Sequence, residues 1–297
     1  MFDKSDLFPT NGIISLVRWS CMNKYLRLFR MGNVLIGSFA ILIAAFMATG
    51  TAMIDYWHNL IVGFFVVFAF IAGGNSLNDY IDVDIDRTAH PDRPVPSGEL
   101  TALQARNIGV FMLVLSALLS LLTMDIPCIA IVIIAVILMF SYELLTKKRG
   151  FIGNVTIALM TGMVFLLAGA LVGDWTANIA VGGMAALVTV GREISKDIED
   201  MDSDIGRRTL PMAIGVKNAS IVASIFYIAG PILSWYPIYL HPENYLYYSV
   251  ILADLAFFYC AYIVFKNPHA AEKKAKIGML FGLLAFILSA IYFSFLA

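Results

Sequence analysis

The sequence predicts an all-α, polytopic membrane protein with nine transmembrane helices. Apolar residues make up 60% of the 297 residues and charged residues only 14%, which is typical of a membrane protein and not of soluble domains. Apolar runs near the ~20 residues that a spanning helix needs recur along the chain. Lysines and arginines lie in the N-terminal segment and in or beside alternate loops, a pattern typical of multi-pass topology.

The predicted spans follow one another in a regular order. They cover roughly residues 33–53, 60–78, 103–122, 126–146, 152–173, 177–195, 219–238, 246–265 and 277–296. The seventh is the weakest, because Pro231 and Pro237 interrupt its apolar run and could kink or shorten it. Residues 13–30 combine apolar and basic side chains, so we expect an interfacial N-terminal segment that leads into the first span.

The distribution of basic residues predicts the orientation in the membrane. All 20 lysines and arginines lie in the N-terminal segment or around the loops after spans two, four, six and eight. Because cytoplasmic loops retain such residues, we expect the N-terminus and these loops to be cytoplasmic and the C-terminus to lie outside the cell membrane. The net charge of −1 and the scattered basic residues predict no nucleic-acid partner.

One acidic pattern occurs twice, at the ends of spans two and six. The first copy covers residues 78–86 and the second covers residues 196–204, 118 residues later. On a helix that turns by roughly 100° per residue, three aspartates of each copy fall within about 60° of one another. These residues are Asp79, Asp82 and Asp86 in the first copy and Asp197, Asp200 and Asp204 in the second.

The offset between the two acidic copies predicts an internal duplication. It corresponds to about four spans with their loops, which favours two four-helix parallel repeats, roughly 33–146 and 152–265, followed by one further helix. We expect one domain that covers residues 1–297. Because four spans separate the copies, both acidic ends should face one cytoplasmic cavity.

The acidic copies indicate a metal site. Like charges on one face repel one another beside a bilayer, and a divalent cation between them relieves this repulsion. Mg²⁺ takes one or two protein carboxylates and completes its shell with phosphate oxygens and water, so we expect two ions bridged by a lipid-tailed diphosphate. The predicted metal ligands are Asn78, Asp79, Asp82, Asp86, Asp197, Asp200 and Asp204.

Other polar residues near the spans are candidates for diphosphate or substrate binding. Arginines just beyond the carboxylates could pair with phosphate oxygens, and a lysine at the end of span four could do the same. Each has an alternative explanation as a topology signal, an interfacial anchor, a snorkelling side chain or a helix cap. The candidates are Arg30, Asn33, Arg93, Tyr142, Lys147 and Arg208. Asp254, deep in span eight, is a separate functional candidate.

With these motifs, the chain resembles the UbiA superfamily of intramembrane prenyltransferases over most of its length. The family motif N-D-x-x-D-x-x-x-D after the second span is matched at residues 78–86, followed by R-P-x-P-S-G at residues 93–98. The second family motif is usually D-x-x-x-D-x-x-x-D. Here Lys196 occupies its first position, with Asp197 beside it.

Within the superfamily, residues 195–215 and 150–154 are most similar to those of the archaeal ether-lipid enzymes. This resemblance implies Mg²⁺-dependent transfer of a geranylgeranyl group from geranylgeranyl diphosphate to geranylgeranylglyceryl phosphate, with release of diphosphate. The implied catalytic residues, which would hold the Mg²⁺, are Asp82, Asp86, Asp200 and Asp204. The implied partners are an isoprenoid diphosphate donor, a lipid phosphate acceptor and membrane lipid.

Two alternatives remain open from the sequence. A related prenyltransferase with an aromatic or quinone-precursor acceptor would share all of the metal chemistry, because neither acidic motif reports on the acceptor. A divalent-ion or anion transporter is the alternative from another class. It is disfavoured because transporters bind their ligands near the membrane midplane, whereas both acidic copies lie at the ends of their spans.

Overall fold

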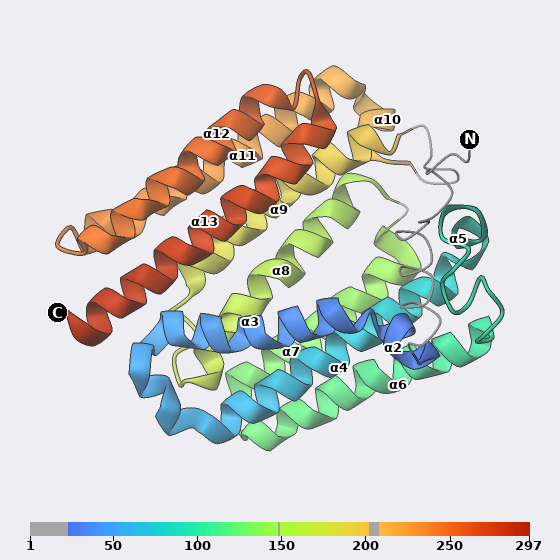
Figure 1. Cartoon of the computed structure of the whole chain (residues 1–297), viewed down its shortest axis with the longest axis horizontal. Helices are drawn as coiled ribbons and strands as arrows, with labels where there is room; N and C mark the ends of the chain where they lie inside the picture. The colour runs from blue at the N-terminus through green and yellow to red at the C-terminus, as the bar shows by residue number, and fades with distance from the viewer. Residues whose placement is uncertain (1–22, 148, 202–207) are drawn as a thin grey trace, which may run out of the picture.

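The computed structural model describes residues 23–147, 149–201 and 208–297, and every regular element among them is helical. Long helices run side by side between the two ends of the molecule (Figure 1). They are α3 (Met31–Thr49), α4 (Trp57–Ile81), α6 (Ala102–Ser120), α7 (Ile126–Ser141), α8 (Phe151–Leu171), α9 (Ile179–Glu199), α11 (Val216–Leu240), α12 (Ile251–Ile263) and α13 (Pro268–Phe295). The shorter elements are α2 (Lys24–Phe29), η2 (Gly50–Tyr56), α5 (Val83–Ala89), η3 (Leu121–Thr123), η4 (Tyr142–Thr146), α10 (Leu210–Ile214) and η5 (Tyr245–Val250).

The protein is a multi-pass membrane protein. In the part of the chain that the structure describes, seven helical segments are long and apolar enough to cross a membrane. One of them, Met31–Ile81, joins α3, η2 and α4, for which the sequence predicts two spans. Helix α9, the predicted sixth span, is not among the seven, since its second half carries several charged residues. Length and composition alone therefore give fewer spans than the predicted nine.

The helices pack in a similar order in the two halves of the chain. Helix α3 packs on α4 and α4 on α6, while α8 packs on α9 and α9 on α11. The halves meet where α8 and α13 contact α3 (Figure 1). Buried apolar side chains form one large cluster among α3, α4, α7 and α8 and another among α9, α11, α12 and α13. Large apolar side chains are also exposed along the outer helix faces, as a lipid-facing surface requires.

Helix α11, the predicted seventh span, is not shortened by its two prolines. It is a continuous 25-residue helix with Pro231 and Pro237 inside it. A proline removes one backbone donor, and neighbouring groups in a membrane protein can satisfy the freed carbonyls. Polar side chains lie close to this part of the helix: the hydroxyl of Ser234 donates to the carbonyl of Pro231 at 2.7 Å, and Tyr247 donates to the carbonyl of Ser234 at 3.1 Å.

The predicted interfacial segment 13–30 is described only from residue 23, and residues 13–22 lie outside the described residues. Its described part forms α2, whose first turn is capped by the Asn23 side chain. Arg30 then adopts the left-handed conformation, with φ 52° and ψ 59°, and separates α2 from α3. The segment therefore does not continue into the first span as one helix.

Helices α8 and α9 approach each other closely at a pair of glycines. A Cβ atom on Gly162 would lie 2.8 Å from the carbonyl oxygen of Gly182, and a Cβ atom on Gly182 would lie 3.0 Å from the carbonyl oxygen of Gly162. A backbone oxygen cannot rotate away as a flexible side chain can. Small residues at this crossing therefore set the distance between the two helices.

We predict that Gly162→Ala lowers the stability of the protein by about 1–3 kcal/mol, the usual cost of overpacking. Unfolding in mixed detergent micelles, followed by circular dichroism, measures the change. Gly32→Ala is the matched control, because Gly32 lies in α3 and a Cβ there meets no described atom within 4 Å. Equal stability of the two variants would contradict the close approach.

Candidate active site

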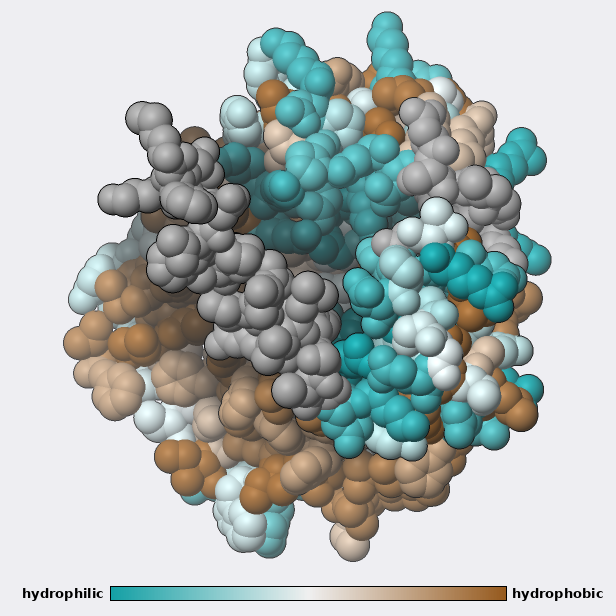
Figure 2. Space-filling model, turned by 45° about the vertical axis from the view of Figure 1, so that its right-hand side comes forward, coloured by the Kyte–Doolittle hydropathy of each residue, from teal (hydrophilic) through white to brown (hydrophobic). Residues whose placement is uncertain are grey.

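The two acidic motifs lie at the same end of the helix bundle. The end of α4 with α5 and the end of α9 with α10 lie on one side of the molecule, and the C-terminus lies on the opposite side (Figure 1). Hydrophilic residues gather on this end around a recess, while apolar residues cover the adjoining flank (Figure 2). The candidate site is thus a polar end of an otherwise apolar bundle.

The backbone is nearly the same in the two motifs. Helix α4 ends just before Asp82, which has φ −90° and ψ 11°, and α9 ends just before Asp200, which has φ −85° and ψ 1°. The amide of Asp82 donates to the carbonyl of Asn78 and that of Asp200 to the carbonyl of Lys196, both at 2.9 Å. Each motif therefore places its middle aspartate at a helix end.

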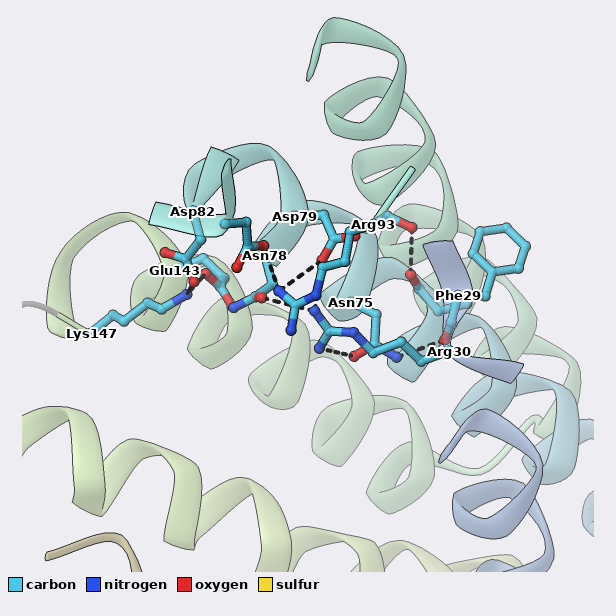
Figure 3. Close-up of polar contacts among 12 residues, drawn as sticks. Phe29, Arg30, Asn75, Asn78, Asp79, Asp82, Arg93, Glu143 and Lys147 are labelled. Carbon is cyan, nitrogen blue, oxygen red and sulfur yellow. Dashed lines mark hydrogen bonds and ion pairs between the residues drawn. The ribbon is translucent and has the colours of Figure 1, made fainter. Parts of the chain in front are cut away.

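Arginines from other elements compensate two carboxylates of the first motif. Arg30 lies 2.6 Å from Asp79 and also donates to the side chain of Asn78 at 3.2 Å. Arg93, in the loop after α5, pairs with Asp86 and lies 3.8 Å from Asp79. Figure 3 shows Arg30 and Arg93 beside Asp79. Asp79 is 1% exposed and Asp86 is buried, so both carboxylates depend on these partners.

Arg30 reaches the motif because the chain turns sharply at this residue. Its left-handed conformation lets α2 end beside α4. The side-chain amide of Asn75 in α4 donates to the carbonyl of Phe29 at 2.7 Å and also accepts from Arg30 at 3.4 Å. The turn and the guanidinium are thus held by the helix that carries the acidic motif.

Asp82 has a different partner. The ammonium of Lys147 lies 2.7 Å from Asp82 and 3.1 Å from Glu143, and Asn78 donates to Glu143 at 3.4 Å (Figure 3). Glu143 and Lys147 are brought together by η4, a π-helical turn in which the amide of Lys147 donates to the carbonyl of Tyr142. The side chains of Lys147 and Glu143 are only 5% and 4% exposed.

The predicted alignment of Asp79, Asp82 and Asp86 assumes one regular helix, whereas α4 ends and α5 begins at Asp82. The helix breaks at Asp82, so Asp82 faces Lys147 while Asp79 and Asp86 face arginines. Among residues 23–147, 149–201 and 208–297, no group of three or more acidic, histidine or cysteine side chains is placed to hold a metal ion. The donor set still suits Mg²⁺, because it consists of carboxylate and amide oxygens and Mg²⁺ takes only one or two carboxylates from a protein.

The second motif contributes to a polar pocket of about 50 Å³. Within it, the amide of Asn154 donates to Asp197 at 2.9 Å. The pocket also includes Lys147, which pairs with Asp82 of the first motif, so one side chain connects the two motifs. The lining residues are Tyr142, Lys147, Gly150, Gly153, Asn154, Glu193, Lys196, Asp197, Asp200 and Thr209.

Two glycines at the start of α8 bring the walls of this pocket together. Gly150 has φ +55°, and a Cβ atom there would lie 2.7 Å from the carbonyl oxygen of Arg208. A Cβ atom on Gly153 would lie 2.8 Å from the carbonyl oxygen of Thr146. The backbone before α10 and the end of η4 therefore both lie directly against α8.

Not all predicted residues join these contacts. Asp204 lies outside the described residues. Asn33 is exposed on α3. Arg208 is also exposed, although its carbonyl oxygen lies next to Gly150, which lines the pocket. Asp254 is buried in a different place, in the wall of an apolar cavity of about 340 Å³ among α8, α9, α11, α12 and α13, where both carboxylate oxygens lie 3.0 Å from the hydroxyl oxygen of Ser234.

The structure also adds residues that the sequence did not single out. Glu143 could have been found from its spacing of four residues before Lys147, which favours an ion pair on a helical turn. Asn154 lies in a segment used for the family resemblance, but its contact with Asp197 is a tertiary one. Thr209 also lies in a segment used for the family resemblance, but it reaches the pocket through a tertiary contact, the close approach of Gly150 to the backbone before α10.

The chain belongs to the UbiA prenyltransferase family, whose profile matches residues 38–293, and it is therefore a membrane-embedded prenyltransferase. It is similar to the digeranylgeranylglyceryl phosphate synthases of Methanosphaera stadtmanae (34% identity; 91% of this chain and 100% of the relative) and Methanobrevibacter smithii (32% identity; 92% and 100%).

Solved structures agree with this assignment. A structure of a digeranylgeranylglyceryl phosphate synthase is 33% identical, with a TM-score of 0.78 over 90% of this chain and 98% of the other. A UbiA homologue from Archaeoglobus fulgidus, solved with DMAPP and Mg²⁺, is 17% identical, with a TM-score of 0.62 over 91% and 98% of the two chains. The second comparison shows that the fold is shared.

We predict that Arg30→Ala destabilises the protein by about 3–5 kcal/mol, because it leaves the buried Asp79 carboxylate without its nearest cation. Adding Asp79→Asn to this variant should recover much of the loss, since the uncompensated charge is removed. Unfolding in mixed detergent micelles measures both effects.

The exposed pair of Arg87 and Asp84 provides the control for this prediction. Their side chains lie 3.4 Å apart and are 68% and 86% exposed. Arg87→Gln should therefore change stability by less than about 0.5 kcal/mol. If Arg30→Ala had no larger effect than Arg87→Gln, the compensation of Asp79 by Arg30 would be disproved.

Proposed function

We propose that the protein transfers the geranylgeranyl group of geranylgeranyl diphosphate to the free hydroxyl of geranylgeranylglyceryl phosphate in archaeal ether-lipid synthesis. The observation that carries this proposal is the position of Lys147 at the polar end of the apolar bundle. Lys147 pairs with Asp82 of the first motif and lines the same pocket as Asp197 and Asp200 of the second. Relatives named digeranylgeranylglyceryl phosphate synthase, similar over nearly the whole chain, support the choice of donor and acceptor.

The proposal includes the topology predicted from the sequence. Nine spans form one domain, as two parallel four-helix repeats and a final helix, with the N-terminus and the site cytoplasmic and the C-terminus outside. The similar helix ends at Asp82 and Asp200 support the repeats. The confinement of basic residues to one set of loops supports the orientation, as does the position of the C-terminus opposite the motifs.

In the proposed enzyme, both motifs provide oxygen ligands for two Mg²⁺ ions. The ligand set is Asn78, Asp79, Asp82, Asp86, Asp197, Asp200 and Asp204, of which Asp82, Asp86, Asp200 and Asp204 are the catalytic residues. When bound, Mg²⁺ would neutralise the negative charge that develops on the departing diphosphate. The carboxylates would then exchange part of their present pairing with arginine and lysine for the metal and its diphosphate.

Arg30, Arg93 and Lys147 supply positive charge for the oxygens of the donor diphosphate. In the reaction, the bond between C1 of the prenyl group and the diphosphate oxygen breaks, and its electron pair leaves with the diphosphate. The acceptor oxygen forms the new ether bond to C1, and the hydroxyl proton is released. The ring of Tyr142, in the wall of the pocket, would stabilise positive charge on the prenyl group.

For the acceptor, Arg208 remains a candidate for phosphate binding, because its carbonyl oxygen lies next to Gly150, which lines the pocket. Asn33, whose side chain is exposed on α3, remains a second candidate for the acceptor phosphate. A prenyltransferase with an aromatic or quinone-precursor acceptor is the second candidate function. Membership of the UbiA family is compatible with an aromatic acceptor, but the relatives named digeranylgeranylglyceryl phosphate synthase favour the lipid acceptor.

We predict that the purified protein, with Mg²⁺ and geranylgeranyl diphosphate, releases pyrophosphate only when geranylgeranylglyceryl phosphate is present. A panel that also contains a hydroxybenzoate and a naphthoate, analysed by mass spectrometry of the lipid products, makes the test. If an aromatic acid were prenylated and the glycerol phosphate lipid did not react, the proposed acceptor would be wrong, while the family assignment would still hold.

We predict that Asp82→Asn and Asp200→Asn each reduce turnover by about 100-fold or more, since even outer partners of a metal site cost 10–100-fold when removed. Removal of divalent ions with EDTA should abolish turnover, and added Mg²⁺ should restore it. Asp84→Asn is the matched control, because Asp84 belongs to the same motif as Asp82, but its side chain is 86% exposed and pairs with the exposed Arg87. Near-normal turnover by Asp82→Asn or Asp200→Asn would exclude a metal role for that residue.

A further inference from the structure

The two acidic motifs differ in charge at their first position. Asn78 and Lys196 are 118 residues apart, and the carbonyl of each accepts the amide of the middle aspartate of its motif. In the first motif this position carries a neutral amide, which accepts from Arg30. In the second motif, the first position carries the ammonium group of Lys196. The second motif therefore has a cation of its own, where the family usually has an aspartate.

The ammonium group of Lys196 is available to a ligand. Lys196 lines the polar pocket, its side chain is exposed, and among the described residues its ammonium group has no hydrogen-bond or ion-pair partner. The other lysine of the pocket, Lys147, is held by Asp82 and Glu143. Within the described part of the pocket, Lys196 is thus the lysine whose charge is not already paired with a carboxylate.

Thr209 provides an independent observation in the same pocket. Thr209 is 4% exposed, and its hydroxyl oxygen is buried without a hydrogen-bond partner in the described structure. The hydroxyl does not cap α10, although Thr209 directly precedes this helix. A buried hydroxyl without a partner is costly, so a ligand that accepts its hydrogen bond would remove the cost.

We propose that Lys196 and Thr209 bind the phosphate group of the lipid acceptor and make the enzyme select a phosphate-bearing acceptor. An ammonium and a hydroxyl are both donors, and phosphate oxygens are strong acceptors. The pocket of about 50 Å³ exceeds the ~10–15 Å³ that one water needs, so it admits a small polar group. This inference rests on the proposed function and assigns one substrate group to one pocket.

The alternative source of phosphate oxygens is the donor diphosphate. Its charge is matched by the cations around the first motif, Arg30, Arg93 and Lys147. The acceptor carries its phosphate and its reactive hydroxyl on neighbouring carbons of glycerol, so its phosphate must bind beside the reacting centre. The pocket meets this requirement. It is lined by Asp200 of the second motif and by Lys147, which pairs with Asp82 of the first motif.

The test compares geranylgeranylglyceryl phosphate with geranylgeranylglycerol, which lacks the phosphate. In the wild type, we expect kcat/KM to be much higher for the phosphorylated lipid. Lys196→Gln should reduce this preference about tenfold or more, as expected for the loss of a hydrogen bond to a charged group, with the KM for geranylgeranyl diphosphate unchanged. Thr209→Val should reduce the preference by a smaller factor, and Lys196→Arg should retain most of it.

Lys273→Gln is the matched control, because Lys273 is an exposed lysine of α13 outside the pocket. It should leave the preference unchanged. If the wild type prenylates geranylgeranylglyceryl phosphate but Lys196→Gln keeps the full preference, this inference is wrong and the proposed function stands. A rise in the KM for the diphosphate alone would assign Lys196 to the donor instead. If the wild type prenylates neither lipid, the proposed function itself fails.

Discussion

The site depends on the compensation of carboxylates at the end of an apolar bundle. Asp79 is 1% exposed, and an unpaired charge at such a position is strongly unfavourable. The compensating cations come from separate parts of the chain: the turn between α2 and α3, the loop after α5, and the π-helical turn that ends α7. The irregular backbone at Arg30 and at η4 is therefore explained by charge, because each irregularity brings a cation to the acidic motif.

The sequence predicted the helical fold well because the backbone in a bilayer must satisfy its own hydrogen bonds. Apolar runs of spanning length therefore become helices regardless of local detail. Helix α11 illustrates this rule, since Pro231 and Pro237 did not interrupt it. Helix α9 shows the limit of reading spans from composition. It is a long helix, but the charged residues of its second half exclude it from the segments that are apolar enough to cross a membrane.

The candidate site was predictable only in part. The spacing of the aspartates identified both motifs, but the helical period assumes a straight helix, and the helices end at Asp82 and Asp200. Which cation meets which carboxylate depends on contacts between distant segments, such as Lys147 with Asp82, and periodicity carries no information about these. The same holds for Thr209, whose position follows from the close approach of Gly150 to the backbone before α10.

The two motifs combine similar backbones with different partners. At equivalent positions, Asp79 is met by the charged Arg30 and Asp197 by the neutral Asn154, while the first position of the motif changes from Asn78 to Lys196. The first motif thus receives its positive charge from outside, and the second carries a lysine within it. An enzyme that joins two different substrates needs such asymmetry, because identical halves would bind the same group twice. A few side-chain changes on a repeated backbone are sufficient to provide it.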